Sequence, residues 1–277
     1  MPIPEALRFR AGDKVTDIDP GATPGFKGSK SDGQQLQEER SARLAELQEL
    51  LYANHKAADD PRSVLLVLQG MDASGKGGIV KHVVGAVNPM GVRYTAFGKP
   101  TEEELAHHYL WRIRRALPPA GHIGVFDRSH YEDVLVVRVH NLVAPEVWGA
   151  RYDEINAFER ELVDNGVTLV KAAMFISPEE QKKQLLERLD DPTKHWKYNP
   201  GDVDERLRWA DYQEAYQAVL DRTSTDYAPW YVVPSDRRWY SRLAITELLI
   251  AALEGLDLSW PPATFDIETE RRRLLDS

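Results

Sequence analysis

The chain has 277 residues, with 44 acidic and 35 basic side chains, a net charge of −9 and no cysteine. This composition is typical of a globular protein of one large or two small domains. It excludes disulfides, zinc–thiolate sites, iron–sulfur clusters and cysteine nucleophiles, and it argues against general binding to duplex DNA. No apolar run approaches the ~20 residues of a membrane span, and residues 1–10 lack a signal core. We therefore expect a cytoplasmic protein with no nucleic-acid or membrane partner.

The predicted elements alternate between helices and strands along the chain. An irregular arm over 11–33 precedes an amphipathic helix over 34–56, where leucines recur at helical spacing. Short apolar runs predict strands at 63–69, 92–97, 122–126, 167–176 and 230–233. Helical patterns lie between and after these strands. One extends to about residue 87, and others cover 101–113, 145–165, 203–223 and 239–253. A further helical pattern begins at 177 and is broken at 190–201.

This alternation requires crossover connections and predicts an α/β fold. We expect a three-layer α/β/α sandwich with a parallel five-stranded sheet. The main domain should span residues 61–257 and carry a helical lid at about 182–223. Residues 1–60 should pack on this domain as an arm and a helix, and residues 258–277 should form a tail.

The main chemical signal is a glycine-rich loop between the first predicted strand and the next helix. The segment from Gly70 to Gly77 matches the phosphate-binding pattern G-x-x-x-x-G-K, in which backbone N–H groups surround a phosphate. Lys76 should bridge the outer phosphates, and the following helix offers its positive end. The predicted phosphate contacts are Gly70, Ala73, Ser74, Gly75, Gly77 and Gly78. A plain glycine-rich turn is the alternative.

Gly77 stands where the standard loop carries a metal-binding Ser or Thr. A Mg²⁺ ion must then find other oxygen ligands, and Asp72 within the loop is the obvious candidate. The alternative for Asp72 is a turn-forming residue that bonds its own backbone.

A second motif, from Phe126 to Asp133, follows the third predicted strand. Asp127 ends that strand, which is the position of the second metal-side carboxylate in phosphate-loop enzymes. The neighbouring Arg128 is suited to pair with phosphate. Helix capping and a surface ion pair are the alternatives for these two residues. For His130, Tyr131 and Glu132, packing and a ligand role are equally supported.

The segment from Gln181 to Tyr198 is basic although the chain is acidic. Such a stretch suits a lid that closes on phosphate charge, and Arg188, Lys194 and Lys197 are the candidates for contact. A solvated helix face is the alternative reading for any single lysine.

Together these motifs closely resemble the second family of polyphosphate kinases. The resemblance rests on Gly70–Gly78, on Gly98-Lys-Pro-Thr-Glu-Glu-Glu104 and on Phe126–Asp133, and it extends from about Asp19 to about Glu254. It includes Gly77, so the missing hydroxyl belongs to the family's own pattern.

The resemblance implies a thymidylate-kinase-like phosphate-loop fold and reversible, Mg²⁺-dependent phosphoryl transfer between polyphosphate and nucleotides, with Mn²⁺ as a second candidate metal. The stretch 127–140 looks most like the subgroup that accepts both AMP and ADP. A homo-oligomer, dimer or tetramer, is expected. The functional positions carried over are Asp72, Lys76, Asp127, Arg128 and Arg188, with Asp72 and Asp127 on the metal, Lys81 on polyphosphate, and Lys99, Pro100, Thr101, Tyr131 and Glu132 at the nucleotide.

Two other functions stay open at this point. One is an ATP-dependent nucleoside monophosphate kinase on the same fold, which differs in its phosphoryl donor. The other is a regulatory switch that binds nucleotide and acts through a partner. Acidic residues combined with a basic lid favour an enzyme.

Overall fold

The computed structural model describes residues 1–277, and its centre is one parallel sheet with the strand order β2-β3-β1-β4-β5. All the predicted strands are confirmed and lie close to their expected bounds. They are β1 (Ser63–Gln69), β2 (Val92–Ala96), β3 (Ile123–Asp127), β4 (Val167–Phe175) and β5 (Trp230–Pro234).

Helices connect these strands and cover the sheet. The α-helices are α1 (Ile3–Leu7), α2 (Lys30–Ala58), α3 (Lys76–His82), α4 (Glu102–Leu105), α5 (Leu110–Ala116), α6 (Val136–Val139), α7 (Pro145–Asp164), α8 (Pro178–Asp190), α9 (Gly201–Leu207), α10 (Trp209–Thr223), α11 (Arg238–Glu254) and α12 (Ile267–Leu275). Short 3₁₀ turns include η4 (His130–Asp133) and η5 (Pro192–Lys197).

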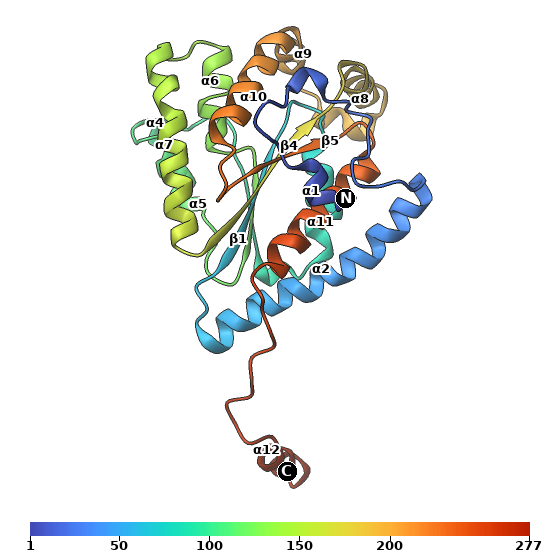
Figure 1. The fold of residues 1–277 in the computed structure, drawn as a ribbon, viewed down its shortest axis with the longest axis vertical. Coiled ribbons are helices and arrows are strands. Elements are labelled where there is room, and N and C mark those ends of the chain that lie inside the picture. Colours follow the sequence, from blue (N-terminus) through green and yellow to red (C-terminus); the bar gives the residue numbers. More distant parts are fainter.

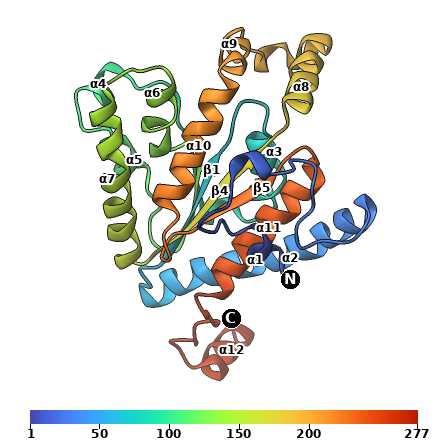
Figure 2. The ribbon, with the colours of Figure 1, turned by 45° about the horizontal axis from the view of Figure 1, so that its top comes forward.

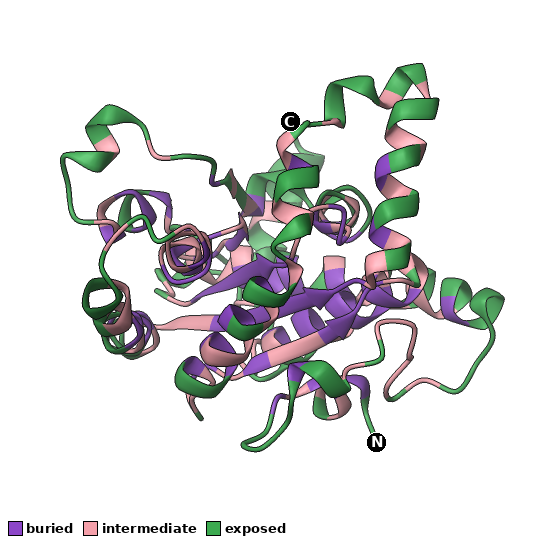
Figure 3. Ribbon diagram, turned by 90° about the horizontal axis from the view of Figure 1, so that it is seen from above, coloured by how far each residue is buried: buried purple, intermediate pink, exposed green.

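The molecule has the predicted three layers, with a hydrophobic core on each face of the sheet (Figure 1). Successive side chains of β1 point to opposite faces, so Leu65 and Val67 join one core while Leu66 and Leu68 join the other. Helices α5, α7 and α10 cover the first face, and α2, α3 and α11 cover the second. Figure 3 shows the buried strands between helices whose outer faces are exposed.

The sequence placed some helix boundaries wrongly. Helix α2 begins at Lys30, inside the expected irregular arm, because Ser29 and Asp32 form a capping box at its start. The expected helix over 101–113 is divided into α4 and α5. Helices α1, α6 and α12 were not predicted.

The predicted lid also extends too far along the chain. The later part of α10 packs in the core, where Ala215, Val219 and Leu220 are buried. Figure 2 shows α8 and α9 standing away from the sheet. The projecting part therefore comprises α8, η5 and α9, which we call the helical wall. Every helix of the structure is too short or too polar to span a bilayer.

Candidate active site at the carboxyl edge of the sheet

The glycine-rich loop lies between β1 and α3, at the edge of the sheet where all strands end. Gly70 is required there because a Cβ atom would lie 2.6 Å from the Met174 carbonyl oxygen. Gly75 has a φ of +104°, which side-chain-bearing residues rarely adopt. These glycines let the backbone curl back over the end of β1, as a phosphate-binding loop requires.

Lys76 opens α3 and points back into the loop. Its Nζ atom donates to the carbonyl oxygens of Gly70, at 2.5 Å, and Met71, at 3.3 Å. Burial lowers the pKa of Lys76, and the nearby carboxylates of Asp72 and Asp127 oppose this shift. The ammonium group is thus held among carbonyl oxygens and carboxylates at the mouth of the loop.

The end of β3 brings a second set of charges to the same place. Arg128 follows Asp127 with a φ of +63°, uncommon for a residue with a side chain. Its Nη2 atom lies 2.8 Å from Asp72 Oδ1, so the structure joins the two sequence motifs directly. Burial alone would lower the pKa of Arg128, but the carboxylates of Glu132, Asp72 and Asp127 raise it.

Carboxylate oxygens near the loop suit a magnesium ion. The negative charges of Asp72 and Asp127 both act to raise the pKa of Lys76, which places both carboxylates near its ammonium group. Burial raises the pKa of the neighbouring Glu132. No cluster of three or more acidic or histidine side chains is arranged as a complete metal cage. Mg²⁺ commonly uses one or two carboxylates together with substrate phosphates, so the residues present fit such an ion.

The helical wall faces the loop from the other side. Arg188 Nη1 lies 3.0 Å from Asp202 Oδ2, which joins α8 to α9. Burial raises the pKa of Asp202, and the carboxylate of Asp72 across the gap raises it further. Gln181 donates from Nε2 to the Asp72 carbonyl oxygen at 3.0 Å. The helical wall is therefore tied to the loop through its base, next to Arg128.

One cleft of about 760 Å³ runs from the loop to the segments that follow β2 and β3. Near the loop its lining includes Asp72, Arg128 and Glu132. Its lining also includes the apolar residues Phe97, Pro100, Leu135, Val136, Leu142 and Val143, with the charged side chains of Lys99, Arg112, Asp133 and Arg151 among them. A cleft that combines charged groups with apolar surface suits a ligand with phosphates and a flat ring, such as a nucleotide.

A family model for polyphosphate kinase 2 matches residues 27–259, which is most of the chain. The chain belongs to the polyphosphate kinase 2 family. This membership confirms the resemblance seen in the sequence motifs, and the matched region contains the loop, both sides of the cleft and the helical wall.

Relatives and solved structures of the family agree with this assignment. The chain is 48% identical to an AMP/ADP-polyphosphate phosphotransferase of Meiothermus ruber, over 88% of this chain and 90% of that protein. It is 39% identical to an ADP-polyphosphate phosphotransferase of Rhodopseudomonas palustris, over 93% and 92%. A crystal structure of polyphosphate kinase 2 from Arthrobacter aurescens superposes with a TM-score of 0.98 at 50% identity, covering 100% of this chain and 98% of that one.

Several residues predicted from the sequence line the polyphosphate kinase cleft and others lie outside it. Lys99 and Pro100 line it, whereas Thr101 caps α4 and is exposed. Lys81 is exposed on α3. On the helical wall, Lys194 pairs with Asp191 at 3.2 Å, and the Lys197 ammonium lies 4.9 Å from the ring centre of Trp196.

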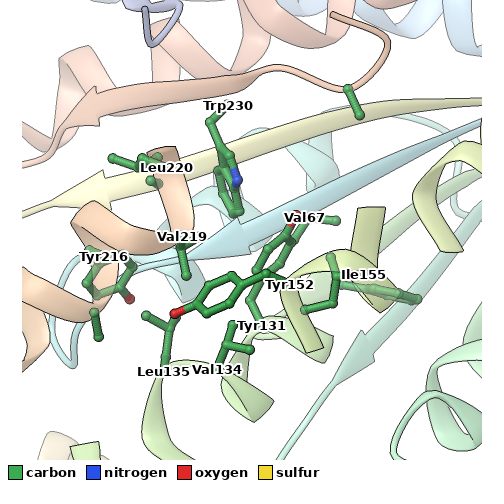
Figure 4. Close-up of a cluster of buried hydrophobic side chains, with 14 of the residues drawn as sticks. Val67, Tyr131, Val134, Leu135, Tyr152, Ile155, Tyr216, Val219, Leu220 and Trp230 are labelled. Atoms are coloured by element: carbon green, nitrogen blue, oxygen red, sulfur yellow. The ribbon is translucent and has the colours of Figure 1, made fainter. Parts of the chain in front are cut away.

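Tyr131 was predicted to lie at the nucleotide, but the structure buries its side chain in the core. Its side chain is completely buried beside Tyr152 and Trp230, so it is not part of a nucleotide site (Figure 4). Its hydroxyl donates to Glu159 Oε1 at 2.7 Å and accepts from Lys171 Nζ at 3.0 Å. The residue next to it, Glu132, does line the cleft.

Sequence reasoning missed two arginines of α11 that lie beside the phosphate loop. Arg238 donates from Nη2 to the Ala73 carbonyl oxygen at 3.1 Å, and Arg242 Nη2 lies within 3.9 Å of the position a Cβ would take on Gly78. Burial lowers the pKa of both guanidinium groups. Their spacing of four residues on one helix face was the available signal, but nothing local indicated that this face meets the loop.

Proposed function

We propose that this protein transfers a phosphoryl group between inorganic polyphosphate and nucleotides, converting ADP to ATP and AMP to ADP. The observation that carries the proposal is the Arg128–Asp72 contact of 2.8 Å at the mouth of the cleft. It places a cation and a carboxylate from two motifs beside Lys76. The similarity to AMP/ADP-polyphosphate and ADP-polyphosphate phosphotransferases supports the choice of substrates.

The proposed reaction depends on alignment and charge, because phosphoryl transfer needs little covalent help from a protein. Apolar side chains of the cleft hold the nucleotide base, with Lys99 and Pro100 beside it and Glu132 near the nucleotide phosphates. The loop from Gly70 to Gly78 holds the donor phosphate through its backbone N–H groups. Lys76, Arg128 and Arg188 then neutralise negative charge on the transferring group.

Asp72 and Asp127 are the proposed ligands of a divalent cation, Mg²⁺ or Mn²⁺. When bound, the ion would neutralise phosphate charge and help to fix the geometry of the phosphates. One of the nearby carboxylates orients the attacking phosphate oxygen. Polyphosphate beyond the reacting end lies along the cations Lys81, Lys194 and Lys197.

The donor decides between this proposal and an ATP-dependent monophosphate kinase. Purified protein is incubated with long-chain polyphosphate, Mg²⁺ and either ADP or AMP, and the product nucleotides are quantified. We expect ATP from ADP and polyphosphate without a second nucleotide. Phosphorylation of AMP by ATP, with no product from polyphosphate, would favour the monophosphate kinase. Nucleotide binding with negligible turnover would favour a regulatory switch.

Self-association into a dimer or tetramer is part of the same proposal. The cytoplasmic location stays a prediction from the sequence, and the cysteine-free composition is compatible with a reducing compartment.

A further inference from the structure

The chain beyond α11 leaves the body of the molecule (Figures 1 and 2). Its last side-chain link to the body is the 2.9 Å hydrogen bond from Asn54 Nδ2 to the Ser259 carbonyl oxygen. Residues 260–277, here called the tail, form no hydrogen bond or ion pair with the rest of the chain. The tail contains no buried residue.

The tail nevertheless contains an ordered, amphipathic helix. Asp266 caps α12 by accepting a 2.7 Å hydrogen bond from the Thr269 backbone N–H. At 100° per residue, Ile267, Leu274 and Leu275 fall within an arc of about 100°, the width of an apolar stripe that faces a core, and the long side chain of Arg271 lies within the same arc. Large apolar side chains of the tail are all more than half exposed: Trp260, Phe265, Ile267, Leu274 and Leu275.

Such a segment is not expected to keep its position alone in water. Isolated helices shorter than about 12–15 residues are marginal, and α12 has 9 residues. An apolar stripe on a helix is normally buried against another element. The tail therefore needs a surface that its own chain does not provide in this arrangement.

The likeness to the Arthrobacter aurescens crystal structure indicates where that surface lies. The superposition covers 100% of this chain with a TM-score of 0.98, and a displaced tail would hold the score below that value. The tail therefore takes the same projecting position in that crystal, where copies of the same chain are its neighbours. Another copy of the same chain is then the available support.

We propose that the tail packs through its apolar stripe on a second copy of this chain. This inference goes beyond self-association by naming the segment that makes the contact. If two copies exchanged tails, each copy would cover Ile267, Leu274 and Leu275 of the other. The two equal contacts would form a closed symmetric interface. It does not depend on which reaction the enzyme catalyses.

The first test uses the full chain with the paired substitutions Leu274→Asp and Leu275→Asp. The matched control is Arg272→Asp, which changes the net charge equally but lies outside the apolar stripe. Molar mass is measured by light scattering during gel filtration. We expect wild type and control to exceed the single-chain mass of 31.5 kDa and the paired variant to form a smaller assembly. A monomeric wild type, or equal masses for wild type and paired variant, would overturn the proposal.

The second test distinguishes contact with a partner from folding back onto the same chain. Because the protein has no cysteine, Ser277→Cys supplies a single attachment point for a photocrosslinker at the end of the tail. Labelled protein is mixed with an unlabelled copy lengthened by a tag and then irradiated. A product joining the two sizes is expected. Crosslinks confined to single chains would contradict an exchange of tails, and circular dichroism of each variant checks that its body is folded.

Discussion

The two walls of the cleft are built differently. The loop wall, formed by residues 70–78 and 127–133, stands on buried strands and contacts a network of fully buried side chains. In that network Lys171 Nζ donates to Glu159 Oε2 at 2.6 Å and to the Thr223 carbonyl oxygen at 2.7 Å. The helical wall instead exposes much apolar surface, including Trp196 at 79% and Leu207 at 81%.

This difference in burial suits the loop wall for precise positioning and the helical wall for movement. The groups proposed to meet the reacting phosphorus, which need precise positioning, are carried by the loop wall, where buried contacts fix the backbone. Arg188 and the lysines of η5 are carried by the helical wall, which rests on few buried side chains, among them Gln181 and Leu185. Regions with few buried contacts open at low free-energy cost, so the helical wall is the part expected to move when polyphosphate enters.

The strongest test of the loop wall removes its charges. Lys76→Ala and Asp127→Asn should each lower kcat by on the order of 10²–10³, because each removes a preorganised contact to phosphate or metal. Steady-state rates with polyphosphate and ADP measure the effect, and thermal unfolding monitors the fold. Near-full activity in either folded variant would mean that the site is assigned wrongly.

The same contrast explains what the sequence predicted well. The apolar run 63–69 and the glycine spacing of 70–78 are local signals, so strand, loop and following helix were placed correctly. Glu159 and Lys171 gave no local signal. They lie on α7 and β4, and only tertiary packing brings them beneath the segment that carries Arg128 and Glu132. The start of α2 was missed although its capping box, Ser29 with Asp32, is local.

The buried network should govern stability more than chemistry. Lys171→Met leaves the Glu159 carboxylate buried without its cation, and breaking such a pair typically costs about 3–5 kcal/mol of folding free energy. Denaturant unfolding measures the loss. Adding Glu159→Gln to Lys171→Met removes the unpaired charge and should recover part of it. If the double variant were no more stable than the single one, the charge pair would not be the source of the effect.

The helical wall is probed by Arg188→Ala. Its guanidinium contacts Asp202 and the Lys197 carbonyl oxygen, and in the proposed reaction it reaches the transferring phosphoryl group. We expect kcat to fall about tenfold, equivalent to about 1.4 kcal/mol, with polyphosphate saturating. Arg206→Ala on the same wall is the control, since Arg206 bonds the Pro178 carbonyl oxygen and Gln181. An equal loss in both variants would indicate a purely structural role for Arg188.

Asp72→Asn examines the metal at the junction of the two walls. The substitution removes one proposed oxygen charge without changing the size of the side chain, and Gly77 cannot supply a hydroxyl in its place. The Mg²⁺ concentration needed for half-maximal rate should rise several-fold with nucleotide saturating. Titration of activity against Mg²⁺ measures this shift. An unchanged Mg²⁺ requirement would favour a role for Asp72 in holding Arg128 alone.

The smallest expected effect comes from the two lysines of η5, of which Lys197 is exposed and Lys194 is half-buried. Neither ammonium group is buried, and a charge in contact with solvent contributes about 0.2–1 kcal/mol, so Lys194→Ala with Lys197→Ala should raise the KM for long polyphosphate only a few-fold. Because screening weakens exposed charges, the apparent affinity of wild type for polyphosphate should fall with added salt more steeply than its affinity for ADP. The variant should show a shallower salt dependence for polyphosphate, with the KM for ADP unchanged. If its salt dependence matched that of wild type, polyphosphate would not bind along the helical wall. The polyphosphate would then bind along the cations beside the loop wall, Lys81, Arg238 and Arg242.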